Sequence, residues 1–97
     1  MTRPELIRAI VECLRAFAVG KEPAEITERT DPIRTLGCSS HDGVDFACDL
    51  SVRLKLDIPH TFNPFVDDNR NSSRSVGEIA DALLTIIKDK KEGGHGN

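Results

Sequence analysis

Apolar side chains recur at helical spacing in three separate segments of the chain, and this periodicity limits the fold more than any other feature of the sequence. In the first segment, Thr2 can cap a helix, Pro4 suits its first turn and Gly20 ends the pattern. Its apolar face consists of Leu6, Ile7, Ile10, Val11, Leu14 and Phe17. We therefore expect a helix over residues 3–18.

The second and third segments predict helices over residues 40–54 and 76–88. The second begins at Ser39 or Ser40, and its apolar side consists of Phe46, Ala47, Leu50 and Leu54, with Val44 at the margin. The third opens with Ser75 and Glu78 at the spacing of a capping box. Its apolar residues are Val76, Ile79, Ala80, Leu83, Ile86 and Ile87.

Two connecting segments contain Pro, Gly, Asn and Ser without a sustained period, which is typical of loops. The first covers residues 20–39, and its expected inward-facing anchors are Ile26, Ile33 and Leu36. The second covers residues 60–75, and its apolar residues are Phe62, Phe65 and Val66. Since these are too apolar for a wholly solvated loop, we expect at least one Phe to pack over the end of the bundle and to help wall a cavity. A mobile insertion with exposed rings is the open alternative.

No segment shows the alternation of a β-strand, so the sequence predicts a small all-α bundle. We expect a single domain over residues 1–90 and a disordered tail over residues 91–97. The predicted core includes Leu14, Phe46, Leu50, Leu54, Ile79 and Leu83.

Charge and cysteine content limit the functional classes. The net charge of −3 argues against a nucleic-acid binder, and residues 31–68 hold seven acids against three bases. The three cysteines, Cys13, Cys38 and Cys48, are odd in number and lack a CxxC spacing. No apolar run approaches membrane-spanning length. We therefore expect a cytoplasmic protein with no membrane span, whose thiols serve in packing.

Ser39 and Ser40 precede the second predicted helix, and two roles are open for them. One serine can cap the helix, which is the common role of serine at this position. The other can hold a phosphate, because free backbone N–H groups and the positive end of the helix dipole point there. Three carboxylates, Asp42, Asp45 and Asp49, share the helix face roughly opposite its apolar side.

The wider stretch from Ile33 to Pro59 resembles the acyl carrier protein family. The family's pattern is matched by Leu36-Gly37, Ser40, Val44-Asp45, Leu50, Leu54, Leu56 and Ile58-Pro59. The stretch from Ser75 to Leu83 is similar to the opening of the family's last helix. Together with the periodicity of the first helix, the resemblance covers most of the chain.

The resemblance implies an acyl-carrier-like four-helix bundle with three main helices and a short one. It implies that Ser40 bears 4'-phosphopantetheine, donated from coenzyme A by a phosphopantetheinyl transferase. The thiol of this arm would hold acyl groups as thioesters in a fatty-acid, lipid or secondary-metabolite pathway. Such a protein is a monomeric carrier rather than an enzyme. Its partners would be acyl-transferring or condensing enzymes whose basic surfaces bind Asp42, Asp45 and Asp49.

Three departures from the family pattern indicate a specialised carrier. Ser39 stands where fatty-acid carriers usually have Asp, and His41 stands where they usually have Leu. The segment between Pro59 and Val76 is longer than usual, with an apparent insertion at residues 63–71. These departures keep open an alternative, an unmodified carrier-like protein-interaction module. A helical DNA-binding regulator is a more distant alternative. Cys38 and His41 have the spacing of half a metal site, but no second pair of ligands accompanies them, so we expect no metal.

Overall fold

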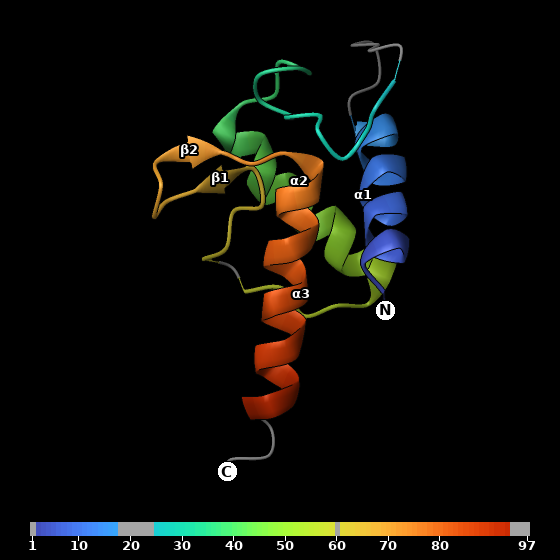
Figure 1. Cartoon of the computed structure of the whole chain (residues 1–97), viewed down its shortest axis with the longest axis vertical. Helices are drawn as coiled ribbons and strands as arrows, with labels where there is room; N and C mark the ends of the chain where they lie inside the picture. Colours follow the sequence, from blue (N-terminus) through green and yellow to red (C-terminus); the bar gives the residue numbers. More distant parts are fainter. Residues whose placement is uncertain (1, 18–24, 60, 94–97) are drawn as a thin grey trace.

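The described part of the chain forms three helices and a short β-hairpin (Figure 1). The computed structural model describes residues 2–17, 25–59 and 61–93, the last five by their backbone alone. The helices are α1 (Arg3–Phe17), α2 (Ser40–Leu54) and α3 (Val76–Gly93). Helix α1 packs against both α2 and α3. The chain is therefore mostly helical, as its periodicity predicts.

The segment between α2 and α3 contains two short strands, whereas the sequence predicted a loop without strands. Strands β1 (Val66–Asp67) and β2 (Ser72–Ser73) pair antiparallel, with Val66 opposite Ser73 and Asp67 opposite Ser72. No fourth helix occurs among the described residues 55–59 and 61–75. Strands this short cannot display an alternating pattern, which is why the sequence did not reveal them.

The helix ends agree with the cap residues in the sequence. At α1, the Thr2 hydroxyl accepts from the Glu5 N–H at 3.4 Å, and the Glu5 carboxylate accepts from the Thr2 N–H at 2.9 Å. At α3, the Glu78 carboxylate accepts from the Ser75 N–H at 2.9 Å, which confirms the predicted capping box. The predicted end of the first helix at Gly20 lies outside the described residues.

Helix α3 is longer than its apolar pattern suggests. The pattern indicates an end near Lys88, whereas the helix continues to Gly93. The first residues of the segment expected to be a disordered tail, 91–93, are thus helical, and residues 94–97 lie outside the described residues. Polar residues with good helix propensity can extend a helix beyond its buried face, because propensity requires no packing partner.

The core forms where the apolar faces of the three helices meet. Its fully buried members include Leu14, Phe46, Leu50, Ile79 and Leu83, as predicted. Leu54, expected among the core residues, is only half-buried and packs against the core. The loop anchors Ile26 and Leu36 are buried and Ile33 is half-buried, which confirms their inward orientation.

The loop before α2 also supports the start of α3. The Val76 and Gly77 N–H groups donate to the Thr30 and Glu28 carbonyls, both at 2.8 Å. These contacts satisfy N–H groups that have no partner inside the helix.

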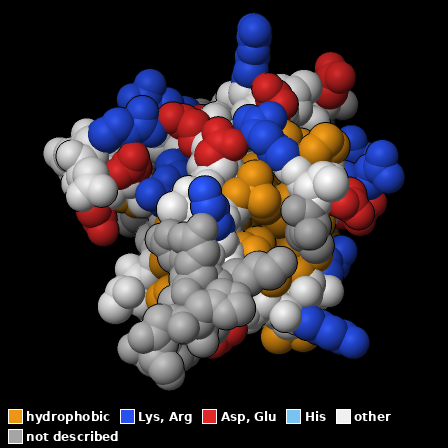
Figure 2. All heavy atoms as spheres, turned by 60° about the horizontal axis from the view of Figure 1, so that its bottom comes forward, with side chains coloured by type: hydrophobic (Ala, Val, Ile, Leu, Met, Phe, Trp, Pro, Cys, Tyr) orange, Lys and Arg blue, Asp and Glu red, His pale blue; other side chains and the backbone are white. Residues whose placement is uncertain are grey.

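The surface carries both signs of charge. Figure 2 shows the face on which α3 ends, where hydrophobic side chains form a strip between basic and acidic side chains. No described helix is long and apolar enough to cross a membrane.

Candidate functional site

Ser39 and Ser40 have different roles at the start of α2. Ser39 is the N-cap, with an extended backbone (φ −91°, ψ 166°), and its hydroxyl accepts from the Asp42 N–H at 3.2 Å. The Asp42 carboxylate accepts in return from the Ser39 N–H at 2.8 Å. This reciprocal pair is a complete capping box, so Ser39 is the serine that caps the helix.

Ser40 is the first residue of α2, and its side chain is exposed. Its hydroxyl takes no part in the hydrogen bonds among the described residues, since Ser39 provides the cap. Its carbonyl oxygen accepts from the Asn63 side-chain amide at 2.7 Å. The Ser40 hydroxyl is therefore exposed to solvent while its backbone is held in place.

Asn63 attaches the segment after Pro59 to the first turns of α2. Besides donating to Ser40, it accepts from the Phe65 N–H through Oδ1 at 2.9 Å. This close approach requires Gly43, because a Cβ atom at that position would lie 1.9 Å from Asn63 Oδ1. Gly43 is accordingly buried against the loop, although it lies within a helix.

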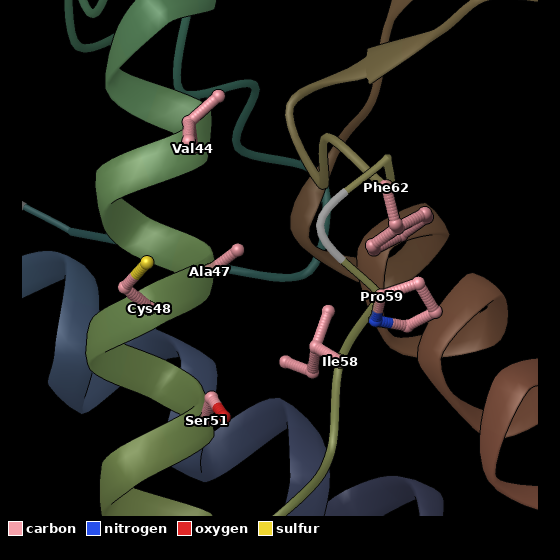
Figure 3. A pocket seen from close by; sticks show the side chains of 7 residues that line it. All are labelled: Val44, Ala47, Cys48, Ser51, Ile58, Pro59 and Phe62. Atoms are coloured by element: carbon pink, nitrogen blue, oxygen red, sulfur yellow. The ribbon is translucent and has the colours of Figure 1, made fainter.

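An apolar pocket opens along α2 (Figure 3). At about 100° per residue, Ser40 lies on the same side of the helix. Helix α2 contributes Val44, Ala47, Cys48 and Ser51. The following segment contributes Ile58, Pro59 and Phe62 across from them. The pocket has a volume of about 90 Å³ and contains no charged side chain. The Ser51 hydroxyl donates to the Leu56 carbonyl, so it is already satisfied.

Arg74 holds the Phe62 wall of this pocket. Its guanidinium lies over the Phe62 ring, 5.0 Å from the ring centroid. Its Nη1 also donates to the Asn63 and Val66 carbonyls, both at 2.8 Å. One side chain thus fixes the aromatic wall, the Asn63 anchor and the first strand of the hairpin.

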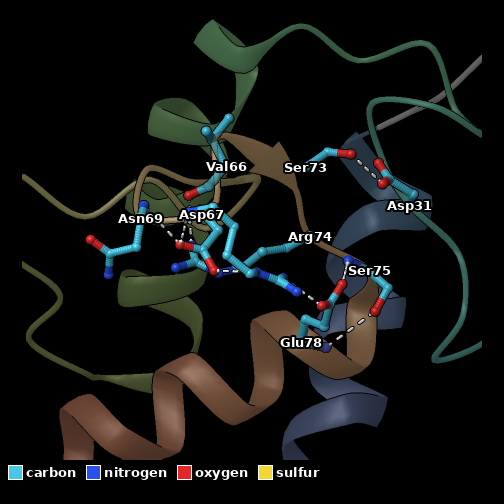
Figure 4. Close-up of polar contacts among 9 residues, drawn as sticks. Asp31, Val66, Asp67, Asn69, Ser73, Arg74, Ser75 and Glu78 are labelled. Carbon is cyan, nitrogen blue, oxygen red and sulfur yellow. Dashed lines mark hydrogen bonds and ion pairs between the residues drawn. The ribbon is translucent and has the colours of Figure 1, made fainter.

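The hairpin is fastened to the rest of the molecule by polar contacts (Figure 4). Arg70 forms ion pairs with Asp67 at 2.8 Å and with Glu78 at 2.6 Å. The Ser75 backbone N–H, together with Arg70, lowers the pKa of the Glu78 carboxyl. The Ser73 hydroxyl donates to Asp31 in the loop before α2. These contacts hold the hairpin against α3 and this loop.

Phe65 joins the hairpin segment to the core. It is fully buried, and its ring lies 5.1 Å from the Phe46 ring and 6.5 Å from the Phe17 ring, measured between centroids. At least one Phe of this loop therefore packs on the bundle, as expected, and Phe62 lines the pocket.

The three carboxylates predicted to share one face of α2 differ in their surroundings. Asp42 is engaged in the capping box. Asp49 accepts from the Cys13 thiol of α1 at 3.2 Å. Asp45 is exposed and forms none of the ion pairs found among the described residues. Asp45 is therefore the carboxylate most available to a partner.

The cysteines also differ. Cys13 is buried, and burial together with the hydrogen bond to Asp49 raises the pKa of its thiol to about 12. Cys38 is buried and Cys48 is exposed at the pocket. Within the described ranges, no three His, Cys, Asp or Glu side chains are grouped so as to hold a metal ion.

Sequence reasoning missed Asn63, Gly43 and Arg74 as parts of the site. The glycine inside a helical pattern was the available signal, because such a residue often marks a close backbone or side-chain approach. Comparison with known proteins adds no further assignment: no family model, curated protein or solved structure matches the chain.

Proposed function

We propose that this protein is an acyl carrier, in which Ser40 bears 4'-phosphopantetheine from coenzyme A through a phosphodiester. The terminal thiol of the arm holds acyl groups as thioesters, which activates the acyl carbon for transfer. The protein carries these groups between enzymes in a fatty-acid, lipid or secondary-metabolite pathway and catalyses no step itself. Its fold, on this proposal, is a variant of the carrier bundle in which a hairpin occupies the inserted segment.

The observation that supports this proposal best is the division of roles between the two serines. A serine that caps a helix has its hydroxyl engaged by the backbone. Ser39 serves that purpose, which leaves the neighbouring Ser40 hydroxyl exposed and free. A phosphodiester at Ser40 would lie beside the N–H groups and the positive dipole end of the first turn of α2.

The pocket beside α2 supports the proposal independently. On a helix with about 100° per residue, Val44, Ala47 and Ser51 lie on the face of Ser40. An arm attached at Ser40 therefore passes the mouth of an apolar pocket as it runs along the helix. A thioester or its apolar chain could shelter there from water between transfers.

The acidic face of α2 suits enzymes with basic docking surfaces, including a phosphopantetheinyl transferase. Asp45 lies one turn beyond Ser40, and its exposed carboxylate can meet a cation while the arm enters the partner's active site. Ser39 and His41 flank the attachment point with side chains unlike those of fatty-acid carriers. The transferase that modifies this chain must therefore accept a serine before and a histidine after the modified serine.

The test is an intact-mass measurement after incubation with coenzyme A and a broad-specificity phosphopantetheinyl transferase. We expect one phosphopantetheine increment per chain, and tandem fragmentation should assign it to the peptide containing Ser40. A protein that stays unmodified with every transferase tried would instead be a carrier-like interaction module. Loss of the phosphopantetheine mass increment after a mild treatment that cleaves phosphodiesters would support a phosphodiester bond between the serine and the arm.

A further inference from the structure

We propose that Asn63 is a positioning residue for the modification of Ser40, because it holds the first turn of α2 in the conformation that presents the Ser40 hydroxyl to a transferase. This inference rests on the proposed function for the reaction at Ser40. The contact between Asn63 and the helix is a property of the chain whether or not Ser40 is modified.

The hydrogen bond from Asn63 reaches the backbone of the serine that the transferase would modify. The side-chain amide of Asn63 donates to the Ser40 carbonyl at 2.7 Å, from 23 positions further along the sequence. In an α-helix this carbonyl also accepts from the N–H group four residues on, at Val44, and a carbonyl oxygen has two lone pairs for such bonds. The Asn63 amide therefore adds to the helical bond and ties the first turn to a separate segment.

The capping box at the same turn has a different effect. Ser39 and Asp42 are bonded to each other within the turn, so they stabilise the end of the helix without fixing it relative to another segment. The ends of helices open more readily than their middles. A restraint that comes from outside the helix, such as the one from Asn63, therefore changes how often the first turn is in place.

Asn63 can restrain the turn because it is itself held from the other side. Its Oδ1 atom accepts from the Phe65 N–H at 2.9 Å, and its carbonyl oxygen accepts from Arg74 Nη1 at 2.8 Å. Phe65 is fully buried, and its ring centroid lies 5.1 Å from that of Phe46 in α2. The amide that bonds Ser40 is thus connected to the core through both the side chain and the backbone of its residue.

The position of Ser40 matters because the proposed reaction needs its hydroxyl in one place. The hydroxyl oxygen forms a bond to the phosphorus atom next to the pantetheine arm of coenzyme A, and the link between the two phosphates breaks. The nucleotide half leaves, and the hydroxyl proton passes to a base of the transferase. Only chains whose first turn is in place can react, so the apparent affinity of the transferase falls in proportion to their fraction.

The experiment measures the kinetics of modification by a broad-specificity phosphopantetheinyl transferase in two variants of Asn63. Asn63→Ser keeps an oxygen for the Phe65 N–H but is too short to reach Ser40. Asn63→Asp keeps the shape of the side chain but cannot donate a hydrogen bond, and high ionic strength screens its added charge. In both we expect the KM for this chain to rise about three- to tenfold, the factor of one hydrogen bond, with kcat within about twofold of the wild type.

Ile79→Val is the matched control. Ile79 is fully buried in α3, so the loss of one methyl group lowers the overall stability without altering the hydrogen bond at Ser40. Its KM and kcat should equal those of the wild type. A residue that contributed only to overall stability would behave in the same way as this control.

Amide hydrogen exchange gives a second readout, which needs no transferase. The Val44 N–H group donates to the Ser40 carbonyl in the first turn, so its exchange rate reports how often this turn opens. In Asn63→Ser we expect this amide to exchange about three- to tenfold faster than in the wild type. In Ile79→Val it should exchange at nearly the wild-type rate, because local opening does not depend on the stability of the whole domain.

The results separate this inference from the proposed function. If the wild type is modified but the Asn63 variants keep its KM, the carrier role stands and Asn63 does not position Ser40. The same conclusion follows if Ile79→Val raises the KM, or the exchange rate of Val44, as much as Asn63→Ser does. If the wild type stays unmodified with every transferase tried, the proposed function fails and this inference fails with it.

Discussion

Gly43 lies one turn into α2, where glycine costs about 1 kcal/mol of helix propensity relative to alanine. The structure explains why a side chain is absent here, since a Cβ atom would lie 1.9 Å from Asn63 Oδ1. Asn63 cannot easily move away, because it bonds both the Ser40 carbonyl and the Phe65 N–H. The helix gives up propensity so that the following segment can attach beside Ser40.

Gly43→Ala should therefore lower the free energy of unfolding by about 1 kcal/mol, since the loss of two hydrogen bonds outweighs the gain in propensity. In an Asn63→Ala background the same substitution should cost less, because only the tight contact with Phe65 Cβ, at 3.1 Å, remains. Urea unfolding of the four proteins in this double-mutant cycle measures the coupling. Equal effects of Gly43→Ala in both backgrounds would show that Asn63 does not set the requirement for glycine.

Cys13 provides a pH-dependent contribution to stability. Burial and the bond to Asp49 raise the pKa of its thiol from 9.0 to about 12, so the folded state holds the proton more tightly than the unfolded state. The contribution is complete below pH 9 and is lost as the pH rises toward 12. Cys48, which is exposed, lacks this environment.

The urea midpoint of the wild-type protein should thus fall more steeply between pH 9 and pH 11 than that of Cys13→Ala. Cys48→Ala serves as the control and should follow the wild type. Parallel curves for wild type and Cys13→Ala would mean that the buried thiol does not titrate differently in the two states.

At the scale of elements, α2 packs one face against the core and leaves another face exposed. The apolar residues Phe46 and Leu50 face inward, whereas Asp45 is exposed one turn beyond Ser40. Asp42 and Asp49 have structural partners of their own, so reversing their charge would disturb the cap or the Cys13 contact. Asp45 is the position at which docking can be tested without altering the fold.

Asp45→Lys should slow modification by a transferase at low salt by several-fold and leave the melting temperature nearly unchanged, because exposed charges contribute mainly to association. Asp68→Lys makes the same change of charge at an exposed position of the hairpin turn and is the matched control. The measurement is the initial rate of the mass increment at two ionic strengths. Identical rates for both variants would remove any specific role for the acidic face.

At the scale of the whole molecule, a core of modest size supports three helices and a hairpin. Leu50 is fully buried in this core, to which all three helices contribute side chains. A domain of this length is stable by only about 5–15 kcal/mol, so the loss of one central side chain is a large fraction of the total.

Leu50→Ala should lower the free energy of unfolding by about 2–5 kcal/mol, because it removes buried surface and leaves a cavity. Val52→Ala, on the exposed side of the same helix, should change it by less than about 0.5 kcal/mol. Thermal unfolding followed by circular dichroism compares the two. If Leu50→Ala unfolded with the wild-type curve, the packing of α2 described above would be wrong.

How much could be predicted from the sequence depends on whether a feature is local. The three helices, the caps at Ser39 and Ser75 and most of the core follow from periodicity and short-range hydrogen bonding, which a single sequence displays. The hairpin and the anchors Asn63 and Arg74 depend on contacts between separate segments. Two-residue strands have no visible period, and nothing in the spacing of Asn63 indicates that it binds the carbonyl of Ser40.

The central claim, attachment at Ser40, is tested most directly by comparing intact masses of wild type, Ser39→Ala and Ser40→Ala after incubation with coenzyme A and a broad-specificity transferase. The account predicts the phosphopantetheine increment in wild type and in Ser39→Ala, where loss of the cap costs about 1 kcal/mol of stability. It predicts no increment in a folded Ser40→Ala, with folding verified by circular dichroism. An increment that persists in Ser40→Ala, or one that is absent from the wild type with every transferase, would contradict it.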